Sequence, residues 1–121
     1  MMPFQNRFKC RVTRVNDPIN FEVIVELGLD IMHRCKIKLH GVKYHKYDAS
    51  DRDSEEYTKF LSLKEFVKSR LLGKEFMIEF ESDNFTKDKA GKFLVKMYEL
   101  DDHEESINEK LVKSGALERF E

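Results

Sequence analysis

Lysine and tyrosine recur between residues 36 and 47, and side chains of these two types can hold a phosphate and a base. Lys36, Lys38 and His40 are two residues apart, so in a β-strand they project from the same face. The segment Lys43–Tyr47 then adds two lysines and two tyrosines with no apolar period. Ammonium groups interleaved with aromatic rings are used to bind single-stranded nucleic acid. The alternative interpretation is that these charges form only a solvated strand face and loop.

Histidines and carboxylates near this segment suggest a second chemistry, in which a metal is bound or a proton is transferred. His40 and His45 could bind zinc together with Asp48 or Asp51, and His45 could act as a base. Their spacing fits no established ligand pattern, and the adjacent lysines disfavour a cation. We therefore expect no metal and no cofactor.

Composition indicates one small domain with an uneven charge distribution. Of its 121 residues 40% are hydrophobic, ten are phenylalanine, and the formal net charge is −1. A core is therefore available, and disorder is not expected. Residues 1–50 hold nine Lys and Arg against five Asp and Glu, whereas residues 51–121 hold thirteen against eighteen. Such an asymmetry can orient a polyanion toward one face, although it is also common on solvated surfaces.

Cysteine usage and hydropathy predict where the protein resides. Cys10 and Cys35 form no metal or redox motif, and each lies in a probable strand, so both are expected to be buried free thiols. The first ten residues lack the apolar segment of a secretory signal, and no run of residues is long enough to cross a bilayer. We therefore expect a cytoplasmic protein with no membrane partner.

Five segments have the composition and period of β-strands. In the second of them Phe21, Val23, Val25 and Leu27 alternate with polar or exposed positions, which predicts one buried face. The first alternates only partly in phase. The five segments cover residues 9–15, 21–27, 36–40, 75–81 and 92–100.

A capping box predicts the first helix, because a serine hydroxyl and a glutamate carboxylate can bind the exposed backbone amides at a helix start. Ser62 and Glu65 form this box, and Leu61 and Phe66 are placed for a hydrophobic staple. Residues 55–60 belong either to the same helix or to a separate turn.

A second capping box, Ser106–Glu109, predicts another helix that Gly115 ends. Five strands, with one helix between the third and fourth and another after the fifth, have the order of an OB-type barrel. Such barrels commonly bind oligonucleotides on a strand face, but the fold alone does not fix the function.

Three segments and their spacing resemble the staphylococcal nuclease-like family, whose members hydrolyse nucleic acids with a bound metal. They are Val15–Gly28, Lys36–Val42 and Ser106–Gly115, within a resemblance that covers about residues 10–120. It implies an α+β, mainly β fold: a five-stranded OB-type barrel with two or three helices. The chain is expected to form a single domain over residues 1–121, with a core of about 8–120.

The resemblance also implies that the metal site has been lost. Active relatives carry Asp-Gly-Asp-Thr in the first turn, and the second aspartate binds the metal. This chain has Asp17–Asn20 there, with Ile19 at the ligand position, and the second metal-binding aspartate corresponds to Lys43. A hard divalent cation needs oxygen ligands, and neither isoleucine nor a protonated lysine offers one.

The residues that act on the phosphate in active relatives are replaced as well. The general-base glutamate corresponds to Lys46, and the two catalytic arginines correspond to Lys38 and Lys92. A protonated lysine cannot accept a proton from water, and it lacks the planar fork with which arginine holds a phosphate. Metal-dependent endonuclease activity is therefore the least favoured function.

Two other functions remain open. The first is a catalytically inactive module that binds single-stranded DNA or RNA, or a nucleotide phosphate, through a lysine cluster. The second is a protein-interaction or inhibitor module on the same fold, in which the acidic runs 51–56 and 101–105 meet a basic partner. Those runs also fit ordinary helix starts. The expected phosphate-binding residues are Lys36, Lys38, Lys43, Lys46 and Lys92, with Tyr44 and Tyr47 alongside.

Overall fold

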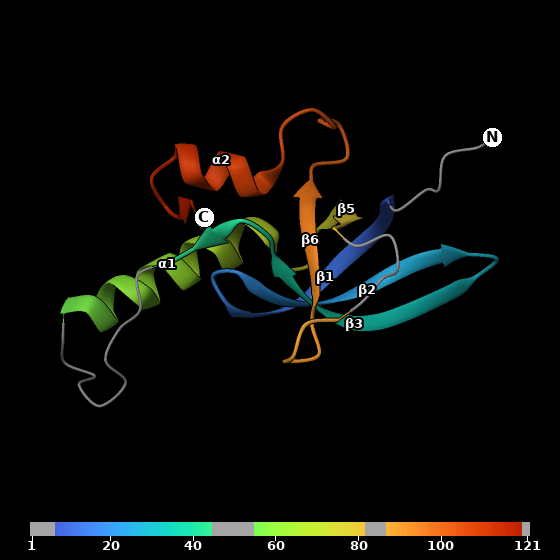
Figure 1. The fold of residues 1–121 in the computed structure, drawn as a ribbon, viewed down its shortest axis with the longest axis horizontal. Helices are drawn as coiled ribbons and strands as arrows, with labels where there is room; N and C mark the ends of the chain where they lie inside the picture. The colour runs from blue at the N-terminus through green and yellow to red at the C-terminus, as the bar shows by residue number, and fades with distance from the viewer. Residues whose placement is uncertain (1–6, 45–54, 82–86, 120–121) are drawn as a thin grey trace.

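Five strands close into a barrel in the computed structural model, which describes residues 7–44, 55–81 and 87–119 (Figure 1). Around the barrel the order is β1 (Arg7–Asp17), β2 (Asn20–Gly28), β3 (Ile31–Leu39), β6 (Phe93–Tyr98) and β5 (Glu75–Phe80). Neighbouring strands are antiparallel except for β3 and β6, which run parallel. This topology is consistent with an OB-type barrel.

Two helices and a small second sheet complete the described part of the chain. The helix α1 (Glu55–Leu71) packs against β1, and α2 (Ile107–Lys113) packs against β6. The short strand β4 (Val42–Lys43) pairs with β7 (Glu118–Arg119). The mainly β, five-stranded barrel with helices that the sequence predicted is confirmed. Within the described residues no helix is both long and apolar enough to cross a membrane.

A β-bulge explains why the first strand alternates only partly. Cys10, Val12 and Val15 are all buried, although their spacing departs from a strict two-residue period. A register shift between Val12 and Arg14 inserts an extra residue opposite β2, so Thr13 and Arg14 are both exposed. The bulge restores the inward direction of the next apolar side chain.

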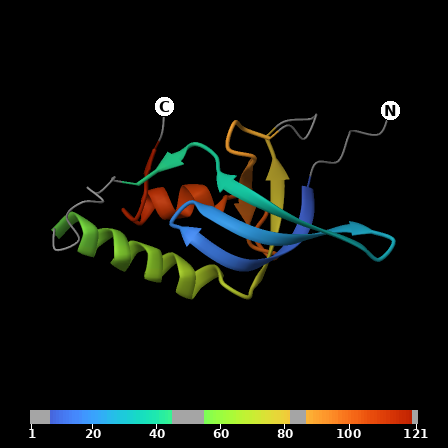
Figure 2. The same cartoon turned by 90° about the horizontal axis from the view of Figure 1, so that it is seen from below.

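Residues 55–60 belong to the first helix, which confirms one of the two predicted alternatives, but the predicted capping role of Ser62 is wrong. The helix α1 begins at Glu55, so Ser62 lies inside it and does not cap it. Leu61 and Phe66 are 42% and 36% exposed, so they do not mark a helix entry packed on the core. The buried residues of α1 lie near its C-terminal end, because its N-terminal half projects away from the barrel (Figure 2). This half makes only partial contacts, because Tyr57, Phe60 and Leu63 are half-buried and none of them is buried in the core.

The second predicted helix start is confirmed at Ser106, which is the N-cap of α2, but the Glu109 carboxylate pairs with Arg119 and completes no capping box in the described residues. Ser106 Oγ accepts a hydrogen bond from the backbone amide of Glu109 at 3.1 Å, at the start of α2. The helix ends at Lys113, and Gly115 then adopts a left-handed conformation with a φ of 85°. Glycine is the residue that takes this conformation without a steric cost.

Asn108 joins α2 to the barrel where β3 and β6 end. Its side-chain nitrogen donates to the carbonyl oxygens of His40 and Val95 at 2.9 and 3.2 Å, and its oxygen accepts from the Met97 amide at 3.0 Å. The residue is 4% exposed, so these bonds replace those it would make with water. They fix the chain just after β3 beside β6.

The β2–β3 hairpin extends beyond the barrel, which places Leu27 outside the core (Figures 1 and 2). Phe21, Val23 and Val25 are buried as expected, but Leu27 is 48% exposed, so that part of the prediction is wrong. A two-residue period predicts the direction of a side chain, but it does not show where the covering strands stop.

Candidate nucleic-acid interface

The outer face of the β1–β2–β3 sheet carries cations at alternate positions. Residues that lie opposite each other across paired strands share a face, and Asn20, Glu22 and Ile24 of β2 lie between these cations. Two carboxylates occupy these register positions: Glu22, which lies opposite both Arg14 and Lys36, and Asp17 of β1, which lies opposite Asn20. The cations are Arg11 and Arg14 on β1, and Arg34, Lys36 and Lys38 on β3.

The cations of β1 are matched by carboxylates of neighbouring strands. Lys9 and Glu75 illustrate the effect, because their hydrogen bond raises the pKa of the lysine above its ordinary value. Arg11 also donates to the carbonyl oxygen of Gly73 at 3.0 Å. The pairs are Arg7 with Glu79, Lys9 with Glu75, Arg11 with Glu75 and Arg14 with Glu22, at N–O distances of 2.8, 3.1, 3.6 and 3.8 Å.

Arg34, Lys36 and Lys38, which we call the β3 row, have no such partners. None of these three side chains forms a hydrogen bond or an ion pair with another residue that the structure describes. Arg34 and Lys36 are exposed and Lys38 is half-buried. Alternate residues of a strand lie roughly 7 Å apart, so the row presents three charges to solvent over roughly 13 Å.

The turn between β1 and β2 uses its aspartate internally. Asp17 Oδ1 accepts from the backbone amides of Ile19 and Asn20 at 2.9 and 2.8 Å. The side-chain nitrogen of Asn20 donates to both oxygens of Asp17, at 2.9 and 2.7 Å. Ile19 is 6% exposed and belongs to the core. These residues do not fit a divalent cation, because the carboxylate is already occupied and the isoleucine has no donor atom.

Lys92 and Lys38 flank Asn20 at one end of the β3 row. Lys92 Nζ donates to Asn20 Oδ1 at 2.8 Å, and Asn20 lies opposite Lys38 in the pairing of β2 with β3. Asp88 positions the backbone of Lys92, because its Oδ1 accepts from the Lys92 amide at 2.9 Å. The structure therefore brings the predicted lysines of β3 and Lys92 to one part of the molecule. The turn after β1 and the loop before β6 meet there.

Lys43 and Tyr44 lie in a different part of the fold. Lys43 is exposed on β4, where it pairs with Glu118 of β7 and not with the barrel. The ring of Tyr44 packs against Phe60 of α1, with 5.5 Å between the ring centroids. This packing occupies one face of a ring that was expected to stack on a base. Lys46 and Tyr47, with His45, Asp48 and residues 51–54, lie outside the described residues.

Two further cations of this region were missed at the sequence level. Arg34 extends the two-residue period of the β3 lysines toward the N-terminus, and this signal was available in the sequence. Lys89 is exposed in the turn that Asp88 closes, where Ala90 also donates its amide to Asp88 Oδ1 at 2.9 Å. The pattern Asp-Lys-Ala-Gly is typical of such turns, so its lysine was predictable as a surface residue.

The histidine and the thiols on the barrel are not arranged for catalysis. His40 Nε2 lies 4.0 Å from Glu81 Oε2, a surface contact. Burial raises the pKa of Cys10 to about 12 and also raises that of half-buried Cys35, so both thiols stay protonated near neutral pH. The prediction of free cysteines is confirmed. Within the described residues, no group of three or more His, Cys, Asp or Glu side chains could hold a metal.

The acidic run 101–105 is partly neutralised within its own region. Asp102 lies 2.8 Å from Lys110, and this hydrogen bond lowers the pKa of Asp102 to about 2. Glu105 pairs with Lys113 at 2.7 Å. This local pairing leaves less negative charge for a basic protein partner.

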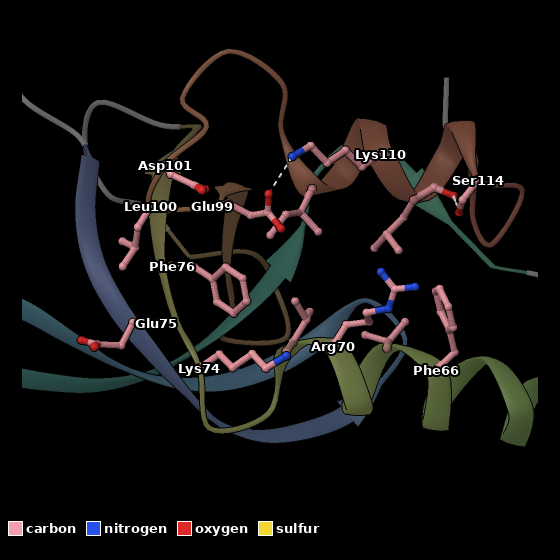
Figure 3. Close-up of a pocket in the computed structure, with 14 residues that line it drawn as sticks. Phe66, Arg70, Lys74, Glu75, Phe76, Glu99, Leu100, Asp101, Lys110 and Ser114 are labelled. Atoms are coloured by element: carbon pink, nitrogen blue, oxygen red, sulfur yellow. Dashed lines mark hydrogen bonds and ion pairs between the residues drawn. The ribbon is translucent and has the colours of Figure 1, made fainter.

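A groove of about 510 Å³ lies between α1, α2 and the end of β6 (Figure 3). Leu71 and Phe76 contribute apolar surface, while Arg70, Glu99 and Lys110 are charged. Lys110 Nζ donates to Glu99 Oε2 at 2.8 Å. Because cations and carboxylates mix around this groove, it favours a polyanion less than the β3 row does.

Comparison with known proteins adds no relative. No protein-family model matches the chain, and no curated protein is significantly similar to it in sequence. The relation to the staphylococcal nuclease-like family therefore stays a prediction. Function has to be argued from the chemistry of the β3 row and the two loops beside it.

Proposed function

We propose that this protein binds single-stranded nucleic acid without cleaving it, through the β3 row and the adjoining loops. The observation that carries the proposal is the contrast in charge pairing: the β1 cations have carboxylate partners, whereas Arg34, Lys36 and Lys38 have none in the described residues. Cations left unpaired along an extended strand are suited to the phosphates of an extended polynucleotide.

The position of the row agrees with the way OB-type barrels bind ligands. They commonly use the face of their second and third strands together with the loops between strands one and two and between strands four and five. In this chain those loops are the Asp17–Asn20 turn and the segment before β6 that carries Lys89 and Lys92. Both loops adjoin Lys38, so a strand crossing β3 would meet a continuous cationic surface.

The chemistry of the row predicts binding to the backbone and little discrimination between bases. At the register positions between the cations, β2 offers Asn20, Glu22 and Ile24, none of which is aromatic. Base stacking therefore adds little there, and affinity depends on contacts with phosphates. Arg34 can hold a phosphate through two hydrogen bonds, whereas each lysine acts as a point charge.

Hydrolysis is not part of the proposal. Asp17 is saturated by hydrogen bonds within its turn, and Ile19 is packed in the core. Lys38 and Lys92 lack the planar fork that stabilises the charge of a transferring phosphoryl group. A phosphate held by this surface would thus have neither a metal nor a base beside it.

Fluorescence anisotropy with labelled single-stranded DNA and RNA tests the proposal. We expect binding at low salt that weakens steeply as the salt concentration rises. A plot of log affinity against log salt concentration should have a negative slope of roughly 0.7 for each phosphate contact. Lys38→Glu should weaken it strongly. Lys68→Glu on α1 makes the same charge change at an exposed position away from β3 and should leave affinity nearly unchanged.

The same samples separate the remaining functions. Equal affinity for the Lys38→Glu and Lys68→Glu variants would overturn the assignment of the β3 row, and no binding at low salt would favour a protein-interaction module. Cleavage of the labelled strand in calcium, abolished by a chelator, would overturn the absence of hydrolysis. Competition by a mononucleotide at similar concentration would indicate a nucleotide phosphate as the ligand.

A further inference from the structure

The outer part of the β2–β3 hairpin has no third strand beside it in the described residues. The last pair between β1 and β2 joins Cys10 to Val25, after which β1 continues along β5. On the other side, β6 pairs with β3 only from Ile37 onward. We call the ribbon formed by residues 26–36 the β2–β3 arm; it extends away from the barrel in both views (Figures 1 and 2). A two-stranded ribbon on its own is marginally stable in water.

The tip of the β2–β3 arm is apolar. Leu27, Leu29, Ile31 and Met32 are 48%, 94%, 54% and 63% exposed, and they make up half of the eight large exposed hydrophobic side chains in the described residues. An apolar patch concentrated on one projection is typical of an interaction site, whereas scattered exposed leucines are not. We therefore expect a binding partner to cover these four side chains.

The conformation of the tip strengthens this conclusion. Leu29 and Asp30 both have positive φ values, of 54° and 63°. Tight hairpin turns with this backbone favour Asn, Asp and Gly, so Asp30 suits its position but Leu29 carries a steric cost. The turn gives no reason for a leucine at this place, whereas a contact with a partner does.

An apolar hollow lies at the base of the same arm. It has a volume of about 220 Å³ and runs along the arm, because Leu27 and His33 line it as well as Cys35. The rest of its wall is formed by Phe8, Val25, Phe80 and Phe93. Lys87 stands beside it, with its Nζ 5.4 Å from the centroid of the Phe93 ring. Lys87 and Asp30 have no ion-pair partner in the described part of the chain.

We propose that a second copy of this chain covers the arm, so that two arms lie antiparallel about a two-fold axis. The apolar tip of each copy would then enter the hollow at the base of the other, and Asp30 of each would reach Lys87 of its partner. Ile31 beside the turn and Cys35 in the hollow lie roughly 13 Å apart along β3, so Leu29 at the turn of one arm can reach the hollow of an antiparallel arm that is offset by this length. Because each copy carries both complementary parts, the contact closes as a dimer.

Charge favours a second copy over other occupants. The tip carries Asp30 and Glu26, so insertion into an anionic lipid surface or contact with nucleic acid would be opposed. The base carries Lys87, whose Nζ lies against the Phe93 ring at the hollow, whereas Arg34 and Lys36 lie on the opposite face of β3 from Cys35. An acidic tip with a cationic base is the pattern that makes a two-fold contact self-complementary.

Analytical ultracentrifugation of the full chain without nucleic acid tests the dimer independently of any binding function. We expect the mean mass to rise from monomer to dimer between micromolar and submillimolar protein. Leu29→Glu should weaken the dimer about tenfold or more, because a buried apolar anchor becomes a charge. Leu61→Glu, at a 42% exposed position of α1, should leave the dimer unchanged.

A charge swap makes the test specific for the antiparallel arrangement. Asp30→Lys and Lys87→Glu should each weaken the dimer, and the double variant should restore it, because the pair re-forms with its signs exchanged. A wild-type chain that stays monomeric throughout, or that forms larger assemblies, overturns the proposal. So does a double variant that is as weak as the single variants. All variants change exposed positions and should fold, which circular dichroism checks.

Discussion

The β1 and β3 strands both carry cations on their outer faces, but those of β1 form ion pairs with carboxylates, and those of β3 form none with the described residues, although Lys36 lies opposite Glu22. In the closed barrel β5 runs next to β1, and its Glu75 and Glu79 pair with the β1 cations. On the corresponding side of β3, β6 begins only opposite Ile37. The number of cations on each strand is similar, so the neighbouring strand decides which charges remain available.

This difference separates two uses of the same residue type. An exposed ion pair contributes roughly 0 to 1 kcal/mol to stability and cancels the field of its members beyond a short distance. An unpaired row contributes no such stability, but it raises the local potential and attracts a polyanion. A count of lysines and arginines cannot distinguish these cases.

Reversing the charges of the whole β3 row should have the largest effect on binding. The variant R34E/K36E/K38E is expected to bind single-stranded DNA about 100-fold more weakly at low salt, because three phosphate contacts are replaced by repulsion. Its melting temperature should fall less than that of a matched β1 variant, because no ion pair is lost in the described residues and only position 36 lies opposite a carboxylate, Glu22. Anisotropy and thermal circular dichroism measure the two quantities on the same samples.

The matched variant R7E/K9E/R11E should show the opposite pattern. It places three carboxylates beside Glu75 and Glu79, so the melting temperature should fall while the affinity falls less than in the β3 variant. If both variants lose affinity equally, the two strands do not differ in function.

Removing one paired cation gives a smaller effect, confined to stability. Arg7 donates through Nε to Glu79 at 2.9 Å, and its guanidinium lies 4.6 Å from the centroid of the Tyr98 ring. Arg7→Ala should therefore lower the unfolding free energy by about 1 kcal/mol. Arg34→Ala, with no partner to lose, should leave the urea midpoint unchanged. A destabilised Arg34→Ala would show that the β3 row has structural partners after all.

Much of the fold could be predicted from the sequence because its signals are local. The strand alternation at Phe21, Val23 and Val25 and the helix cap at Ser106 both appear in the structure. The start of α1 was left open between two alternatives, because its first half is only half-buried at Tyr57 and Phe60 and the contact of Phe60 with Tyr44 is tertiary. The exposure of Leu27 could not be predicted from the sequence either, because it depends on the pairing of β1 with β2 ending at Val25.

The candidate site was predictable in part. The two-residue period of a strand predicted that Lys36 and Lys38 share a face. Arg34 lies two residues before Lys36, so the same rule would have placed it on that face. The placement of Lys92 beside β3 had no sequence signal other than a family resemblance, because it depends on a hydrogen bond to Asn20 from a distant segment. Tyr44 could not be placed, since its packing on Phe60 is a tertiary contact.

Lys38 and Lys92, at one end of the β3 row, should contribute unequally to the affinity for nucleic acid. Lys38→Ala is expected to lower affinity about threefold and to reduce the salt dependence by about 0.7, the amount for one phosphate contact. Lys92→Ala should have a smaller effect on both, because Lys92 Nζ already donates to Asn20 Oδ1. Affinity measured over a series of salt concentrations decides this. Equal slopes for both variants would mean that Lys92 binds phosphate as freely as Lys38.

The smallest expected effect is a change in the pKa of Lys9, which reports directly on its pairing with Glu75. Its pKa is raised above the ordinary 10.5, first by the hydrogen bond with Glu75 and then by the charge of that carboxylate. A pKa raised by folding means that this interaction stabilises the native state below the unfolded pKa, and that the stabilisation is lost as pH rises through the folded pKa. We expect Glu75→Gln to return the Lys9 pKa toward its ordinary value in an NMR titration of the lysine side chains. An unchanged Lys9 pKa in that variant would mean that Glu75 does not neutralise the β1 cations, and the contrast with the β3 row would then need another cause.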